Sequence, residues 1–365
     1  MRSAVENFAN PSSLHAPGLV AHKMLDNARA QILAGMGLVG DRNTRIIFTS
    51  GGTEANNLAI FGTINAKKFK FLPQIITSDS EHPSILEPLS YLESCGLAEI
   101  VKIPTVNGCL DLDLLSETVC DRTVLVSIMS ANNETGALYD VASAFSVAKK
   151  INPQIITHTD AVQAFLKTNM NFRALKADLV SLSGHKVNAP KGVGALAVSG
   201  DIIKAKKLVP IIRGGGQEGD LRSGTENVVG ISAFGAAVKY RKDNLSEFIR
   251  RTSELSELLI SLLPQGIKVN RPEMHAPHIV SITLPSIKSE TALHFLSERG
   301  IFVSSGSACA SNGKHKSYVL RAFGLSELDI DCTLRISLSD IISREDIEYT
   351  ARTLGEAVER LVKIG

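Results

Sequence analysis

The sequence predicts an α/β protein: a large domain with a mainly parallel sheet, residues 1–243, followed by a smaller α+β domain, residues 244–365. In the first two thirds of the chain, short apolar segments alternate with helical patterns, which is typical of βαβ units and a parallel sheet. Polar side chains follow several of these segments, at the strand ends where such sheets bind ligands. From about Asn244 the pattern changes to a charged amphipathic helix followed by fewer strands.

The composition limits the class of protein. A chain of 365 residues, 44% hydrophobic and 21% charged, can bury two sizeable cores. Its formal net charge of +2 predicts neither a nucleic-acid nor a membrane partner, and no apolar run approaches the roughly 18 residues of a membrane helix. The five cysteines are scattered, odd in number and without a CxxC pair, so we expect no disulfide framework, no metal site and a reducing cytoplasm.

The elements of the large domain follow from apolar segments bounded by turn residues. Helical patterns are expected over about 19–33, from 53, after 84 and from about 113. Strands are expected over 45–49, 74–77, 99–103, 123–128, 155–160, 177–182 and 195–198.

The first strand end carries a glycine turn. Ser50-Gly51-Gly52 separates a strand from a helix that begins near Thr53. Backbone N–H groups and the Thr53 hydroxyl at a helix N-terminus form an anion site. The alternative is an ordinary βα loop in which Thr53 caps the helix.

Further polar residues follow the next strands. His82 is a candidate functional residue or a helix cap, and Asn133 lies in an Asn-rich turn that could bind a polar ligand. Asp160 could pair with a protonated ring nitrogen or cap the next helix, and Gln163 follows it. Because carboxyl ends of parallel strands meet at one edge of a sheet, we expect these residues and Lys186 to form one site.

Lys186 lies in the turn Ser183-Gly184-His185-Lys186, between two buried strands. A partly desolvated amine in such a turn is a nucleophile that can form a Schiff base. The alternative is a basic turn at the surface.

The second domain is predicted from a different order of elements. After a long Gly-rich polar loop over 213–227, which is typical of a functional segment, a helix from Val228 is expected to continue past Leu263. Strands are expected over 279–284, 301–303 and 334–338, and helices over 290–299 and 344–362.

A small, polar and basic loop over 304–317 contains Cys309. The nearby Lys314, His315 and Lys316 favour the thiolate, which is the reactive form of cysteine. We therefore expect Cys309 to be a functional thiol, and an incidental packed cysteine is the alternative.

The chain resembles cysteine desulfurases of the NifS/IscS type, in the class V aminotransferase group of pyridoxal-phosphate enzymes of fold-type I. The resemblance spans nearly the whole chain, and its cysteine loop is closer to the NifS/IscS subgroup than to the SufS-like one. The motifs are Ser50-Gly51-Gly52-Thr53-Glu54, Ser80-Glu81-His82, Asn132-Asn133-Glu134, Asp160-Ala161-Val162-Gln163, Ser183-Gly184-His185-Lys186, Arg222-Ser223-Gly224-Thr225 and Ser304-Ser305-Gly306-Ser307-Ala308-Cys309.

The resemblance implies how a pyridoxal 5′-phosphate cofactor is held. Lys186 would bind it as an imine and later move protons. Asp160 would pair with the pyridine nitrogen and Gln163 with the phenolic oxygen, while His82 would stack on the ring and act in acid–base steps. Gly52, Thr53, Ser183 and His185 would hold the phosphate.

The resemblance also implies the partners and the substrate contacts. Thr225 would reach the phosphate of the other subunit of a homodimer. Asn133 would contact cofactor or substrate, and Arg335 would bind the carboxylate of L-cysteine. Cys309 would take the sulfur as a persulfide and release L-alanine.

The expected function is thus sulfur donation for iron–sulfur clusters or tRNA thiolation, to a scaffold or sulfur-acceptor protein. The alternatives are a selenocysteine lyase, a class V transaminase, or a non-catalytic scaffold-binding relative. The last arises because family members usually carry a strand and an Ala-Thr-Thr segment upstream of the Asn10-Pro11 turn, which this sequence does not contain.

Overall fold

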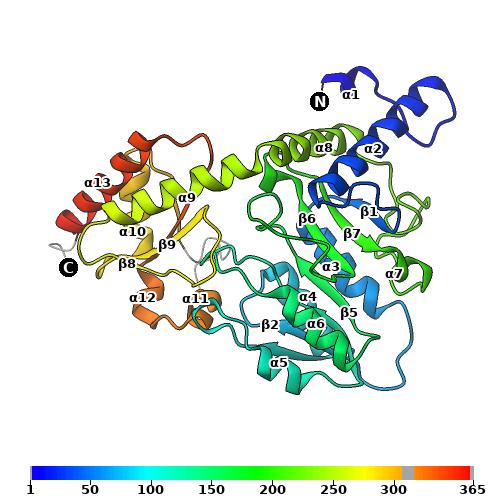
Figure 1. Ribbon diagram of the computed structural model, residues 1–365, viewed down its shortest axis with the longest axis horizontal. Helices are drawn as coiled ribbons and strands as arrows, with labels where there is room; N and C mark the ends of the chain where they lie inside the picture. Colours follow the sequence, from blue (N-terminus) through cyan, green and yellow to red (C-terminus); the bar gives the residue numbers. More distant parts are fainter. Residues whose placement is uncertain (1, 306–315, 362–365) are drawn as a thin grey trace. The chain divides into compact units, whose positions relative to one another are not determined.

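A computed structural model describes residues 2–305 and 316–361 of the chain (Figure 1). The chain forms two compact units. The first contains residues 1–103, 112–130 and 140–244, and the second contains residues 104–111, 131–139 and 245–365. Two short segments from the middle of the chain therefore group with its C-terminal third.

A seven-stranded sheet organises the first unit, in the order β1-β7-β6-β5-β4-β2-β3. Its strands are β1 (Thr44–Thr49), β2 (Gln74–Ser78), β3 (Glu99–Ile103), β4 (Thr123–Ser127), β5 (Ile156–Asp160), β6 (Leu179–Ser183) and β7 (Gly194–Ser199). β7 is antiparallel to both of its neighbours, whereas the pairs from β6 to β3 are all parallel. The prediction of a mainly parallel α/β sheet is confirmed, and the carboxyl ends of β1, β2, β4, β5 and β6 meet at one edge.

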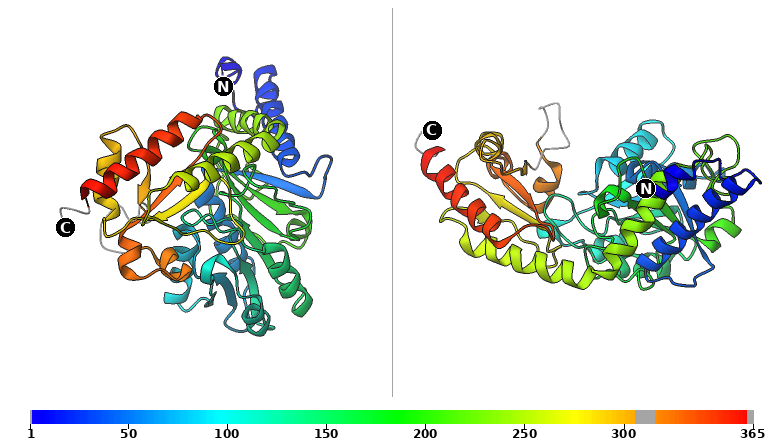
Figure 2. Two further views of the ribbon diagram at one scale, coloured as in Figure 1. Left: turned by 60° about the vertical axis from the view of Figure 1, so that its left-hand side comes forward. Right: turned by 90° about the horizontal axis from the view of Figure 1, so that it is seen from above.

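The helices of the first unit are α1 (Arg2–Glu6), α2 (Ala16–Gly35), α3 (Gly52–Ile64), α4 (Pro83–Ser94), α5 (Leu112–Thr118), α6 (Val141–Ile151), α7 (Gly200–Lys204) and α8 (Val228–Asp243), with the 3₁₀ turn η2 (Gly184–Val187). In Figures 1 and 2, α2 and α8 lie side by side, and they pack together.

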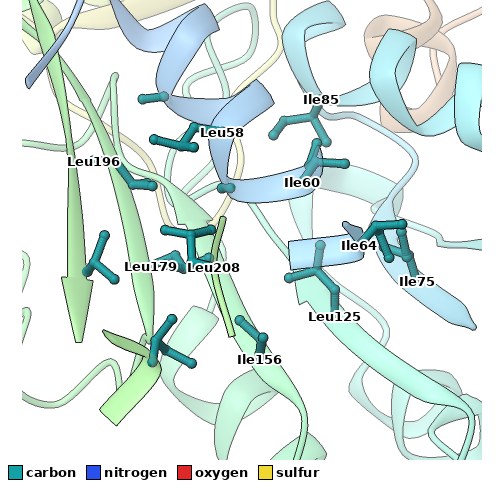
Figure 3. Close-up of a cluster of buried hydrophobic side chains, with 14 of the residues drawn as sticks. Leu58, Ile60, Ile64, Ile75, Ile85, Leu125, Ile156, Leu179, Leu196 and Leu208 are labelled. Carbon is teal, nitrogen blue, oxygen red and sulfur yellow. The ribbon is translucent and has the colours of Figure 1, made fainter. Parts of the chain in front are cut away.

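The core of the first unit lies between its sheet and the helices α3 and α4 (Figure 3). Helix α3 is apolar on most sides, so it is buried along much of its length. Leu58 and Ile60 of α3 and Ile85 of α4 are each at most 1% exposed. This packing fixes the N-termini of both helices at the sheet edge where the strands end.

The second unit has a four-stranded sheet in the order β10-β11-β9-β8, with all pairs antiparallel. Helices α9 and α13 pack together and cover part of its core. Its elements are η1 (Val106–Gly108), α9 (Leu245–Leu262), β8 (Lys268–Val269), β9 (Ile279–Thr283), α10 (Ser289–Ser297), β10 (Ser304–Ser305), α11 (Tyr318–Phe323), α12 (Glu327–Asp331), β11 (Thr333–Ser337) and α13 (Arg344–Leu361).

Two expected elements were wrong in their limits. The helix expected to run from Val228 past Leu263 is interrupted at Asn244, whose side chain donates to the Tyr240 carbonyl 2.8 Å away and competes with the helical bonds. The strand expected over 301–303 lies at Ser304–Ser305, because the Ile301 N–H is used to close the end of α10 on the Leu296 carbonyl.

Within residues 2–305 and 316–361, no helix combines the length and the apolar character that a membrane span requires.

Candidate active site

The carboxyl edge of the large sheet collects most of the predicted site residues. Thr53 follows β1, His82 follows β2, Asp160 ends β5 and Lys186 follows β6. These four lie in the first unit, as do Gly52, Gln163, Ser183, His185 and Thr225. Asn133 and Arg335 lie in the second unit.

The N-terminus of α3 forms a tight anion cradle. Its N-cap is Gly51, which has no side chain to satisfy the first N–H groups of the helix. A Cβ added to Gly52 would approach Val162 Cγ2 to 2.8 Å and Ser183 Cβ to 3.4 Å, so the backbone lies directly against the Asp160 loop and the end of β6. Thr53 is exposed beside this cradle, which therefore fits a phosphate better than a cap.

Lys186 lies in η2, directly after the fully buried strand β6. The lysine is half-buried, and the turn closes at Asn188, which adopts the left-handed conformation with φ 65°. In the same turn, Ser183 Oγ lies 3.0 Å from His185 Nδ1. Both polar groups thus lie beside the lysine and the cradle.

Asp160 is held by one donor on each carboxylate oxygen. Oδ1 accepts from the Val162 N–H at 2.9 Å, and Oδ2 accepts from Asn56 Nδ2 at 2.8 Å. The carboxyl group is buried, with 5% of the residue exposed. It closes a turn and does not cap a helix, so it remains available to a protonated ring nitrogen.

His82 is both the N-cap of α4 and part of the site. Its Nδ1 accepts from the Ser84 N–H at 3.1 Å. Because a backbone N–H can only donate, Nδ1 carries no proton and the neutral ring carries its proton on Nε2. Ser84 Oγ lies 2.8 Å from Nδ1 and accepts from Asn56 Nδ2 at 2.8 Å. A hydrogen-bonded chain thus joins His82, through Ser84 and Asn56, to Asp160.

The charges at this edge act on one another. Burial is the main cause that lowers the pKa of His82, the Asp160 carboxylate raises it, and the Lys186 ammonium lowers it. Burial and Lys186 also lower the pKa of His185. The structure therefore brings the predicted histidines, aspartate and lysine into one electrostatic environment, with His82 neutral at pH 7.

Asn56 and Ser84 were missed by the sequence analysis. Asn56 lies next to Asn57 in the apolar stretch 55–60, where a polar side chain is 1% exposed. A polar residue inside an otherwise buried helix was the available signal, because buried polar groups are kept where they are hydrogen-bonded.

A cavity of about 490 Å³ opens between α3 and α4 in the first unit. Thr53 and His82 line one end of it, and Phe61 and Tyr91, whose rings pack edge to face, line the other. The anion cradle and the histidine therefore face space that a ligand can occupy.

The Gly-rich loop over 213–227 is anchored to α3. Arg222 Nε and Nη2 donate to the two carboxylate oxygens of Glu54 at 2.8 and 3.3 Å, and the Gly224 N–H donates to Gln217 Oε1 at 2.8 Å. Thr225 is exposed on this anchored loop.

In the second unit, Arg335 projects from β11 and is half-buried. Its Nη1 donates to the Asn133 carbonyl at 2.9 Å, and its Nη2 donates to Ser304 Oγ at 3.0 Å. Ser317 Oγ donates to Glu134 Oε2 at 2.6 Å. Both predicted residues of this unit, Asn133 and Arg335, are thus in contact. Cys309 lies outside the residues that the structure describes.

Glu81, next to His82, is fully buried. Its Oε1 accepts from Ser78 Oγ at 2.7 Å and from the Met129 N–H at 2.8 Å, which ties the ends of β2 and β4 together. Burial raises the pKa of Glu81 to about 8 against these two bonds, and the Asp160 carboxylate raises it further.

This raised pKa predicts a pH-dependent stability. The stabilising protonated form is fully present below the unfolded pKa and is lost as pH rises through about 8. Relative to Glu81→Gln, which keeps an acceptor for both donors, the wild type should lose a few kcal/mol between about pH 5 and about pH 8.5. Urea midpoints of both proteins at the two pH values measure this, and parallel midpoints would contradict it.

Comparison with known proteins agrees with this geometry. The model of the family "Aminotransferase class-V" matches residues 4–350. The chain belongs to the aminotransferase class-V family. A cysteine desulfurase IscS of Dictyoglomus turgidum is 37% identical over 361 residues, which cover 98% of this chain and 89% of the relative.

Solved structures of family members have the same fold. A NifS-like protein from Rickettsia africae has a TM-score of 0.87 and 33% identity, with 98% of this chain and 94% of that chain covered. A structure titled "SspA in complex with cysteine" has a TM-score of 0.77 and 31% identity, with 93% and 95% covered. The prediction of an α/β enzyme of fold-type I is confirmed.

Pyridoxal 5′-phosphate is the cofactor of these enzymes, and the predicted cofactor is confirmed. The residues of the first unit fit it. The Gly51–Gly52 cradle has no room for a side chain at Gly52 and suits a phosphate. Asp160, buried with its orientation fixed, suits a pyridinium N–H, and Lys186 is an amine within electrostatic range of His82.

Proposed function

We propose that this enzyme is an L-cysteine desulfurase that leaves a persulfide on Cys309 and releases L-alanine. The observation that carries the proposal is the grouping of Lys186, Asp160 and His82 at the carboxyl edge of one sheet, in a chain whose relatives are named cysteine desulfurases. A persulfide chemistry, in contrast to transamination, needs a thiol, and Cys309 supplies it.

The residues of the first unit hold the cofactor. Lys186 binds it covalently, and the phosphate is bound by Gly52, Thr53, Ser183 and His185. Asp160 pairs with the ring nitrogen, and the bound cofactor supplies an electron sink. Lys186 then moves a proton. His82 Nε2, which carries the proton of the neutral ring, is the atom through which the histidine donates.

Arg335 binds the carboxylate of L-cysteine in this proposal. Its planar guanidinium already donates with Nη1 and Nη2 to two oxygens, the Asn133 carbonyl and Ser304 Oγ. Such a fork can hold a carboxylate with two parallel bonds, which a lysine cannot.

Arg335→Lys should therefore raise KM for L-cysteine by about 10- to 100-fold, with a smaller change in kcat. The matched control is Arg321→Lys, also in the second unit, which loses only an exposed pair with Glu327. Steady-state kinetics measure the effect. An unchanged KM in Arg335→Lys, or an equal change in the control, would contradict the assignment.

Cys309 acts on the sulfur of the substrate. Its thiolate forms an S–S bond as the substrate C–S bond breaks, and the substrate carbon gains a proton to give L-alanine. The sulfur then passes to a scaffold or acceptor protein, for iron–sulfur clusters or tRNA thiolation.

We also propose a cytoplasmic homodimer in which Thr225 binds the phosphate held by the partner subunit. Thr225 supports this because it is exposed on a loop that Arg222 fixes to the α3 N-terminus. Among the described cysteines, Cys95, Cys109, Cys120 and Cys332 are free thiols, as in a reducing compartment.

The experiment that tests the function is alanine formation from L-cysteine by the purified protein loaded with pyridoxal phosphate. Stoichiometric sulfide in the presence of a reductant should accompany the alanine. Formation of pyruvate and no sulfide would instead favour the transaminase, and preference for selenocysteine would favour the lyase. Cofactor binding without any turnover would favour the non-catalytic alternative.

A further inference from the structure

Lys167 is a buried lysine close to the candidate cofactor site. It lies in the turns that follow β5, seven positions after Asp160, and is 7% exposed. Its Nζ donates to Gln163 Oε1 at 2.8 Å. Burying an ammonium group costs free energy, so a lysine held against a neutral amide at this place calls for a role.

The contact determines which way the Gln163 amide faces. An ammonium group can only donate, so the amide atom beside it must be the oxygen. The NH₂ group of Gln163 therefore faces away from Lys167. From that position it can only donate, which is what an anionic oxygen requires.

We infer that Lys167 is a positioning residue that fixes the Gln163 amide as a hydrogen-bond donor to the phenolic oxygen of pyridoxal phosphate. The inference rests on the proposed function, in which Gln163 contacts that oxygen. Lys167 also adds a positive charge behind the amide. Both effects favour the anionic form of the phenolic oxygen, and they disfavour a proton on the neighbouring nitrogen that links the cofactor to Lys186.

The other titratable groups around this position stay in place when Lys167 is changed. Asp160 precedes Gln163 in the same segment, and His185 and Lys186 lie in the turn after β6. The positive charges of Lys186 and Lys167 both lower the pKa of His185, which shows that Lys167 acts electrostatically on this turn. The change in the pH midpoint of the cofactor must therefore be compared among variants that keep these groups.

The test is a pH titration of the visible absorption band of the loaded protein, without substrate. Lys167→Met should raise the midpoint by about one pH unit, because a donor and a positive charge are lost. Lys167→Arg should restore the midpoint, since a guanidinium also donates to Oε1. The matched control is Lys149→Met, which removes the contact of a half-buried lysine with Asp178 at the opposite end of β6.

A second variant keeps the test independent of the folding of Lys167→Met. In Gln163→Glu the half-buried side chain stays paired with Lys167 but loses its donor, so the midpoint should again rise. Unmoved midpoints in both Gln163→Glu and Lys167→Met, or an equal shift in Lys149→Met, overturn the inference and leave the proposed function standing. A wild-type protein that forms no visible band overturns the proposed function, and this inference with it.

Discussion

Lys186→Ala is expected to abolish the visible absorption band of the pyridoxal-phosphate-loaded protein and to lower alanine formation by at least about 10⁴-fold. The amine is the only group in η2 that can bind the cofactor covalently, and no other lysine in that turn can replace it. Because the same amine moves the proton in the proposed reaction, both the covalent attachment and the acid–base step are lost together. Absorption spectra after gel filtration, with alanine assays, measure the two losses.

The matched control is Lys191→Ala, which removes an exposed lysine five positions later, before β7. This variant should keep the band and most of the activity. A band that survives in Lys186→Ala would show that another amine binds the cofactor, and the assignment of Lys186 would then be wrong.

Cys309→Ser should bind the cofactor normally but form no persulfide, and alanine formation should fall by at least about 10³-fold. A serine hydroxyl is a far weaker nucleophile toward sulfur than a thiolate, and it cannot hold a transferable sulfur atom. Mass spectrometry of the protein after one turnover, without reductant, measures the extra sulfur on the peptide that contains residue 309.

Cys109→Ser is the control for general effects of losing a thiol, because Cys109 is exposed and also lies in the second unit. It should form as much persulfide as the wild type. Extra sulfur on Cys95, Cys109 or another cysteine in the Cys309→Ser protein would refute the role given to Cys309.

The strand ends of the large sheet could be predicted because they depend on local pattern. Apolar segments followed by Thr53, His82, Asp160 and Lys186 indicated one sheet edge, and the structure has these residues at the carboxyl ends of β1, β2, β5 and β6. The role of each residue, in contrast, came from the resemblance to a family and stays a prediction.

The contacts that orient these residues could not be predicted, because they join distant parts of the chain. Asn56 and Asp160 are 104 positions apart, and no spacing rule relates them. The same holds for the segment 131–139, which groups with the C-terminal unit through tertiary contacts such as the bond from Arg335 to the Asn133 carbonyl. The break at Asn244 depended on one side-chain bond within a continuous helical pattern.

The position of β1 in the sheet has a consequence for synthesis on the ribosome. β1 is an edge strand whose neighbour in the sheet is β7, so Thr44–Thr49 pairs with Gly194–Ser199, roughly 150 residues later in the chain. At about 5–20 residues per second, β1 waits on the order of 10–30 s for its partner to be made. During this time the apolar residues Ile46, Ile47 and Phe48, each at most 3% exposed after folding, are open to other nascent chains. Slowed translation between β1 and β7 should therefore increase aggregation, whereas a pause after Ser199 should not.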